Sequence, residues 1–183
     1  MNMKCSVYCA ASLDGFIAKL DDNVDWLQKP EYSQSPMKGL VYDEFISTVD
    51  ALVMGRRTFE KALSFGKWPY DGTPVVVLSK RPLRIPLELH GKVRTDAGQP
   101  QEIVSGLEAE GMRHIYVDGG RTLQGFLQAG CINELTITII PILLGAGIPL
   151  FGSMGVEVQL RLLEATPSEN GFVQVRYEVM GGA

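Results

Sequence analysis

Short apolar segments alternate with amphipathic segments along most of the chain. Runs of apolar and β-branched residues predict strands at residues 4–11, 51–54, 75–78, 92–94, 114–117 and 136–140. Apolar residues three and four positions apart predict helices between them, beginning at Ser35-Pro36, Arg56, Pro100 and Leu123. Residues 18–34 are rich in polar and turn-forming residues and are expected to form a surface loop.

The C-terminal part of the chain has the two-residue period of antiparallel strands. Val156, Val158, Leu160 and Leu162 alternate with polar residues, and residues 173–179 repeat that pattern after a polar loop at residues 167–171. Alternating strands and helices that end in such a hairpin predict a three-layer α/β fold. We expect a mostly parallel central sheet with an antiparallel C-terminal hairpin, in a single domain over residues 1–183.

Composition narrows the classes of function. The 183 residues are 45% hydrophobic and 21% charged, with a formal net charge of −4, which argues against a nucleic-acid-binding protein. Residues 135–156 are uncharged, but their prolines and glycines argue against a membrane-spanning helix. Three cysteines without a CxxC pair, and only two histidines, predict reduced thiols, no metal site and a cytoplasmic location.

A pair of glycines follows the strand expected at residues 114–117. Gly119 and Gly120 precede Arg121, Thr122 and Leu123, where a helix is expected to begin. Glycines let the backbone approach an anion, and a helix N-terminus offers free N–H groups. The pattern fits a phosphate-binding turn, and it equally fits a plain connection between a strand and a helix.

Two further strand ends carry residues of the same kind. Gly55 is followed by Arg56, Arg57 and Thr58, and cations at a helix start oppose the helix dipole unless an anion binds there. The third strand ends at Leu78, followed by Ser79 and Lys80. Three such ends suit a dinucleotide that carries a pyrophosphate and a 2′-phosphate, and the cations favour NADP over NAD. The chain has no GxGxxG fingerprint, so an ordinary Rossmann site is not expected.

These segments together resemble the dihydrofolate reductase-like superfamily. The resemblance is strongest to the reductase domain of the bifunctional pyrimidine deaminase/reductase of riboflavin biosynthesis. It rests on the order of pieces that run over nearly the whole chain: Ser12-Leu13-Asp14-Gly15, Met54-Gly55-Arg56-Arg57-Thr58, Val117-Asp118-Gly119-Gly120, Glu134-Leu135-Thr136 and Pro149-Leu150-Phe151.

The resemblance implies NADPH-dependent hydride transfer and a set of contacts for the cofactor. It places Ala10 and Ile17 beside the nicotinamide, with a cis peptide between Gly119 and Gly120. The remaining cofactor contacts that the motifs and the resemblance imply are Gly55, Arg56, Arg57, Thr58, Leu78, Ser79, Lys80, Gly119, Gly120, Arg121, Thr122 and Leu123. It also implies a homodimer.

The substrate side matches the family less closely. Folate reductases carry a carboxylate on the first helix, one turn before an aromatic residue; if Phe45 is that aromatic, Val41 stands in the acid's place. The resemblance makes Asp14 the candidate catalytic carboxylate, although an Asp before a glycine is also a common turn residue. Trp26, Phe45 and Thr138 are the candidate substrate contacts; Trp26 fits a core or loop anchor somewhat better, and Thr138 also suits a strand as a β-branched residue.

The sequence therefore predicts a reductase of the riboflavin type. The family reaction reduces the ribose of a phosphoribosylamino-pyrimidine, but the chain has no deaminase zinc signature, so it is expected to be a stand-alone paralogue acting on that or another small molecule. Two alternatives stay open: a dihydrofolate reductase, and a regulator or inactive paralogue that holds NADPH without turnover.

Overall fold

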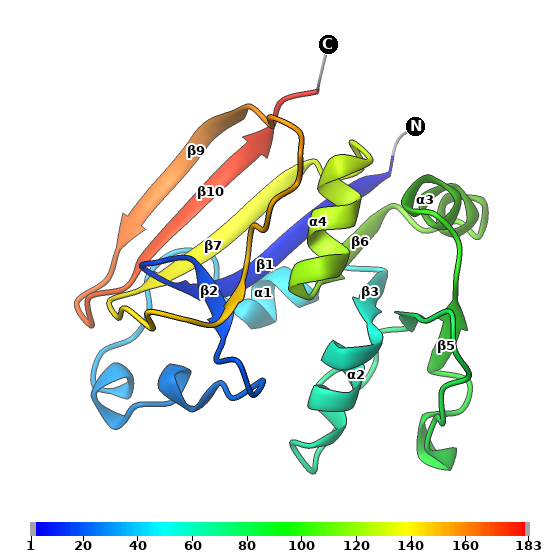
Figure 1. Ribbon diagram of the computed structural model, residues 1–183, viewed down its shortest axis with the longest axis horizontal. Helices are drawn as coiled ribbons and strands as arrows, with labels where there is room; N and C mark the ends of the chain where they lie inside the picture. Colours follow the sequence, from blue (N-terminus) through cyan, green and yellow to red (C-terminus); the bar gives the residue numbers. More distant parts are fainter. Residues whose placement is uncertain (1–2, 182–183) are drawn as a thin grey trace.

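A computed structural model describes residues 3–181 of the chain. Its main sheet has eight strands in the order β5-β4-β3-β6-β1-β7-β10-β9. In chain order these strands are β1 (Lys4–Ser12), β3 (Ala51–Gly55), β4 (Val75–Leu78), β5 (Val93–Asp96), β6 (His114–Asp118), β7 (Glu134–Ile140), β9 (Leu160–Pro167) and β10 (Val173–Val179). The strands from β5 to β7 are parallel, and β10 and β9 form an antiparallel hairpin at the other end (Figure 1). The predicted fold class is confirmed.

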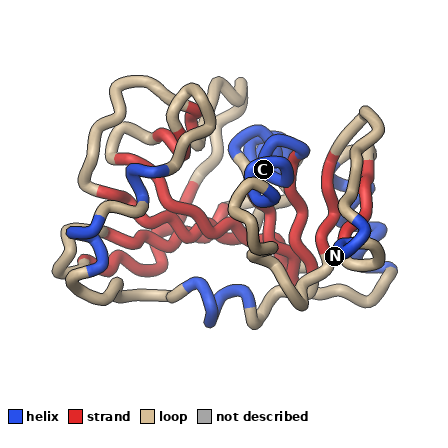
Figure 2. Tube along the Cα trace, turned by 90° about the horizontal axis from the view of Figure 1, so that it is seen from below, coloured by secondary structure: helices blue, strands red, loops and turns tan. Residues whose placement is uncertain are grey.

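Helices cover both faces of this sheet. They are α1 (Tyr42–Ile46), α2 (Arg56–Leu63), α3 (Pro100–Ala109) and α4 (Gly120–Gln128), with short 3-10 turns at Asp25–Leu27, Pro30–Ser33 and Leu87–Leu89. Figure 2 shows helical segments on opposite sides of the band of strands. No helix in residues 3–181 is long and apolar enough to cross a membrane.

Alternation along the strands divides the core in two. Ile115 and Val117 of β6 join one cluster with α3 and α4, whereas Tyr116 joins the other with Phe45 of α1 and Phe59 of α2. Each strand of the sheet centre therefore contributes side chains to both layers, which is the burial expected of a parallel sheet between helices.

The helix predicted to begin at Ser35-Pro36 is wrong in its start. The structure begins α1 at Tyr42, and residues 35–41 form a loop. The Leu40 N–H donates to Gln174 Oε1 at 2.8 Å, and Gln174 Nε2 donates back to the Leu40 carbonyl at 2.9 Å. Because a distant strand satisfies these backbone groups, the segment has no need of helical hydrogen bonds.

The strand predicted from Val156 is also shorter than expected. β9 begins at Leu160, and residues 156–159 precede it as a loop. The apolar alternation of this segment reflects packing of Val158 on the core instead of strand pairing. A separate two-stranded sheet forms from β2 (Phe16–Ala18) and β8 (Ile148–Pro149).

Candidate functional site

The carboxyl ends of the parallel strands meet at one edge of the sheet, where a cavity of about 680 Å³ opens. β3 ends at Gly55 and β6 at Asp118, and their register pairs Met54 with Asp118. The helices α2 and α4 begin directly after these two strands, so their N-termini both face the cavity. Edges of this kind are where open α/β sheets bind ligands.

The two glycine turns interlock. A Cβ added at Gly119 would lie 2.3 Å from Thr58 Oγ1, and one added at Gly55 would lie 2.9 Å from Thr122 Oγ1. Each turn therefore presses its backbone against the hydroxyl that follows the other turn. A side chain at either glycine would collide with that hydroxyl, so the close approach of the two turns requires glycine at both positions.

The peptide bond expected to be cis is trans. Residues 3–181 contain no cis peptide bond, so the prediction for Gly119–Gly120 is wrong. The chain reverses instead through Gly119 itself, whose φ of 92° and ψ of 134° suit glycine and few other residues.

The small β2–β8 sheet borders the same cavity. Ile17 of β2, Ile148 of β8 and Leu150 all line it. Gln124 of α4 donates to the carbonyls of Pro149 and Leu150, at 3.3 Å and 3.0 Å, and so fixes β8 to the helix. A Cβ on Gly120 would lie 3.0 Å from the Pro149 carbonyl oxygen. An apolar wall thus stands against the second glycine turn.

Most residues predicted to hold the cofactor line this one cavity. They are Ala10, Ile17, Gly55, Arg56, Arg57, Thr58, Leu78, Gly119, Gly120, Arg121, Thr122 and Leu123. Ser79 and Lys80 are not among the lining residues. The Ser79 hydroxyl donates to the Arg81 carbonyl at 2.8 Å and shapes its own turn. The three strand ends thus share an edge, but only the first residue of the third segment reaches the cavity wall.

The cations of the cavity are already partly paired. Arg56 lies 3.5 Å from Glu60 one turn along α2, and Arg57 lies 2.5 Å from Asp22 on the loop after β2. Lys61 also lines the cavity, and its ammonium lies over the ring of Phe65. All of these pairs are exposed, so a phosphate could replace the carboxylates at modest cost.

Asp14, the predicted catalytic residue, lies outside the cavity lining. It is exposed, and its carboxylate accepts hydrogen bonds from the Ser12 hydroxyl at 2.6 Å and from the N–H groups of Leu144 and Gly145. The Ser12 hydrogen bond above all lowers the pKa of Asp14. The side chain therefore ties the β1–β2 turn to the loop after β7, and it stays ionised in doing so.

The predicted substrate contacts also lie behind the cavity wall. Trp26 is only 3% exposed and Phe45 only 4%, with Phe45 stacked on Tyr8 at 4.9 Å between ring centroids. Thr138 accepts a hydrogen bond from Gln174 at 3.3 Å. None of the three lines the cavity, whereas Tyr8 and Ala10 do. In the described structure these three residues support the pocket from behind.

A carboxyl group that the sequence did not single out does line the cavity. Asp118 ends β6 and is partly buried, and the Gly119 N–H donates to its Oδ1 at 2.8 Å. Burial raises its pKa, although the Gly119 N–H and the hydroxyls of Tyr116 and Tyr70 oppose the rise. Since Asp118 belongs to the Val-Asp-Gly-Gly motif, its position before the glycines was the available signal.

The hydroxyls of Tyr70 and Tyr116 lie beside this carboxyl. Tyr8, Tyr70 and Tyr116 line the cavity, and the Tyr116 hydroxyl donates to the Tyr8 carbonyl at 2.7 Å. Burial raises the pKa of Tyr70 and Tyr116, so both phenols stay protonated. Val41, which stands where folate reductases have their acid, immediately precedes α1 and carries no carboxylate, and the neighbouring Asp43 and Glu44 are exposed. Asp118, the candidate acid, thus comes from the sheet and not from α1.

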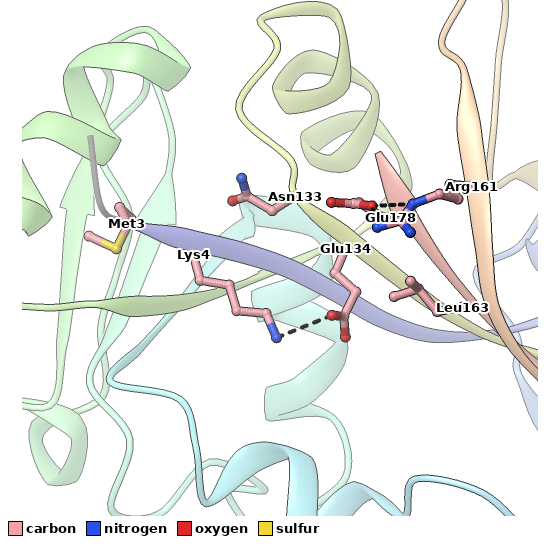
Figure 3. A pocket seen from close by; sticks show the side chains of 7 residues that line it. All are labelled: Met3, Lys4, Asn133, Glu134, Arg161, Leu163 and Glu178. Carbon is pink, nitrogen blue, oxygen red and sulfur yellow. Dashed lines mark hydrogen bonds and ion pairs between the residues drawn. The ribbon is translucent and has the colours of Figure 1, made fainter. Parts of the chain in front are cut away.

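A second hollow of about 360 Å³ lies near the amino end of β1, away from the glycine turns. Figure 3 shows its charged side chains, with Lys4 paired to Glu134 at 3.3 Å and Arg161 paired to Glu178. Since these ions satisfy one another, the hollow offers no free charge to a ligand. The described residues also contain no group of three or more His, Cys, Asp or Glu that could hold a metal ion.

Comparison with known proteins places this arrangement in a family. The family described as the RibD C-terminal domain matches residues 4–174. The chain belongs to this family. It is 34% identical over 180 residues to the uncharacterized protein YwjB of Bacillus subtilis (strain 168), covering 97% of this chain and 98% of the relative.

Solved structures agree with membership of the RibD C-terminal domain family. A putative riboflavin biosynthesis protein from Shewanella sp. PV-4 superposes with a TM-score of 0.86 at 36% identity, over 97% of this chain and 99% of that one. A deaminase/5-amino-6-(5-phosphoribosylamino)uracil reductase from Thermotoga maritima superposes with a TM-score of 0.71 at 12% identity, over 98% of this chain and 57% of that one. The likeness to the Thermotoga protein shows the fold alone. The family match and the Shewanella structure show that the chain is a reductase-like domain of the RibD type.

Proposed function

We propose that this protein is an NADPH-dependent reductase of a small molecule. The interlocked turns at Gly55 and Gly119 carry the proposal, because they bring two helix N-termini and two glycines to one cavity. The backbone N–H groups at these two helix starts suit a pyrophosphate, and Arg57 and Arg121 supply positive charge beside them. When bound there, NADPH would supply the hydride.

The chain's own residues then divide into two groups. Those of α2 and α4 bind and orient the phosphates, while the apolar wall of Ile17, Ile148 and Leu150 keeps water from the reacting end. Asp118 lines the same cavity, and burial raises its pKa, which favours the protonated form of this carboxyl. A carboxyl of that kind can donate a proton to the substrate as it accepts hydride.

Three ligands separate this proposal from its rivals. NADPH should bind the purified protein in a fluorescence titration and should be oxidised when a phosphoribosylamino-pyrimidine is added. Oxidation by dihydrofolate alone would favour a folate reductase, against the absence of an acid at Val41. Binding without oxidation by either compound would favour a regulator or a different substrate, and failure to bind NADPH would overturn the proposal.

The phosphate end has its own test. Arg56→Ala should weaken binding of NADPH by about tenfold but leave NADH much less affected, because only NADPH carries the 2′-phosphate that a guanidinium pairs with. Titration of the variant with both dinucleotides measures the two dissociation constants. Equal losses for the two would place Arg56 elsewhere on the cofactor.

A further inference from the structure

Asp22 pairs with Arg57, one of the cations that line the proposed cofactor cavity. Its Oδ2 lies 2.5 Å from Arg57 Nη2, and both residues line the cavity. Among the described residues that line the cavity, only Asp22 and Asp118 are acidic. Asp118 is held by the Gly119 N–H, so Asp22 is the acid that neutralises a lining cation.

The backbone holds Asp22 in place. It is the one non-glycine residue in 3–181 with a positive φ, at 63°. Its N–H donates to the Lys19 carbonyl at 3.1 Å, and the Lys19 N–H donates to the Asn23 carbonyl at 2.9 Å. Since left-handed backbone is unfavourable for most residues, this closed turn fixes the carboxylate toward α2.

Arg57 stands where the phosphates of a dinucleotide would meet the protein. It lies between Arg56 and Thr58, and Thr58 Oγ1 touches the turn at Gly119. The place where the two turns meet is the one suited to the bridging pyrophosphate. A guanidinium paired with Asp22 through Nη2 has fewer N–H groups left for a phosphate than a free one.

We propose that Asp22 competes with the bridging pyrophosphate for Arg57 and thereby sets how tightly the dinucleotide is held. The inference rests on the proposed function. Cofactor binding breaks the Asp22–Arg57 pair, which detaches the loop of residues 19–24 from α2. Val24 and Leu27, which follow this turn, also line the cavity, so cofactor entry loosens part of the wall around the substrate.

Two asparagine variants test the competition. Asp22→Asn keeps a side chain that tolerates a positive φ but removes the charge, and it should tighten both NADPH and NADH by about two- to five-fold. The gain should shrink at high salt because the pair is exposed. Asp21→Asn changes the charge equally one residue away; Asp21 is exposed and bonds only the Asn23 N–H, so its affinities should match the wild type.

The same Asp22→Asn substitution in an Arg57→Ala background completes a double-mutant cycle. If Asp22 acts through Arg57, the gain from Asp22→Asn should vanish there. Equal gains from Asp21→Asn and Asp22→Asn, or an unchanged or weaker affinity in Asp22→Asn, would overturn the competition. A gain confined to NADPH would overturn the assignment to the pyrophosphate. Wild-type protein that binds neither dinucleotide would overturn the proposed function itself, which the comparison of variants does not address.

Discussion

At the scale of single residues, Asp118 is the proton donor in the proposed reaction. Its carboxyl lines the cavity beside two phenols, and burial raises its pKa. An acid with a raised pKa keeps its proton at a pH where an ordinary Asp has lost it. Asp14, with its lowered pKa, has the opposite property and suits a structural clasp.

Asp118→Asn should lower kcat by about 10²- to 10⁴-fold, since it removes the proton donor. NADPH affinity should change little, because the phosphates lie at the helix starts. In the wild type only the protonated form donates, so activity should fall as pH rises through the raised pKa of Asp118. Steady-state rates from pH 5 to 9, with whichever of the two candidate substrates supports NADPH oxidation, would show this fall. If the same fall in activity with rising pH persists in Asp118→Asn, another group is responsible for it.

Gly119 is the position in the cavity wall at which an added side chain would be tolerated least. Gly119→Ala places a Cβ 2.3 Å from Thr58 Oγ1 at a φ of 92°, so NADPH affinity should fall at least tenfold and the free energy of unfolding by about 1–3 kcal/mol. Urea denaturation and fluorescence titration measure the two losses. Gly106→Ala is the control: Gly106 lies in α3 with open space around it, so this variant should gain about 0.5–1 kcal/mol. If Gly119→Ala binds NADPH as tightly as the wild type does, the two glycine turns do not form the cofactor site.

At the scale of elements, the sequence predicted correctly those strands, helices and turns whose structure is set by neighbouring residues. The strands around Val53, Val76 and Val117 are buried on both faces, so their apolar runs were clear signals. The helix from Pro100 carries its own start, a capping box between Gln99 and Glu102. The glycine turns were visible for the same reason, because glycine and cation at a strand end form a local pattern.

The missed features depend on distant partners. Residues 35–41 read as a helix start, but Gln174 binds the backbone of Leu40 from the other end of the chain. Asp22 and Asp118 owe their surroundings to Arg57 and Tyr70, which no spacing along the chain reveals. Trp26 and Thr138 are buried and lie outside the cavity lining, and the pattern along the chain does not reveal that burial.

Gln174→Ala should show what holds this loop. Gln174 is 2% exposed, and its loss leaves the Leu40 N–H without its acceptor and removes donors to the Leu40 carbonyl and to Thr138, although the Tyr8 hydroxyl still donates to that carbonyl. The free energy of unfolding should fall by about 2–4 kcal/mol, as measured by urea denaturation. Gln159→Ala removes an exposed glutamine and should change stability by less than about 0.5 kcal/mol. Equal effects of the two variants would contradict the anchoring role.

At the scale of the whole molecule, β9 is an edge strand that keeps leucines in solvent. Leu160 is 41% exposed, Leu162 54% and Leu163 43%. Open edges with apolar side chains are prone to pair with another chain. Arg161 and Glu164 flank the two central leucines, so a second copy paired antiparallel about a two-fold axis would bring opposite charges together.

We propose that β9 forms the contact of the homodimer expected from the resemblance. The protein should then sediment as a dimer at micromolar concentration, and Leu162→Lys should shift it to monomer. Leu87→Lys, at a leucine that is 81% exposed far along the chain from β9, should remain a dimer. A monomeric wild type, or equal dissociation by both variants, would contradict an interface at β9.

The contact between the two glycine turns also bears on the stability of the native state against unfolding. The segments 55–58 and 119–122 are distant in sequence and meet only after β3 and β6 have paired. A dinucleotide that spans both turns binds the finished sheet and not the open chain, so mass action makes it a clamp on the fold. If the proposed function holds, the resistance of this protein to proteases would therefore rise with the concentration of NADPH.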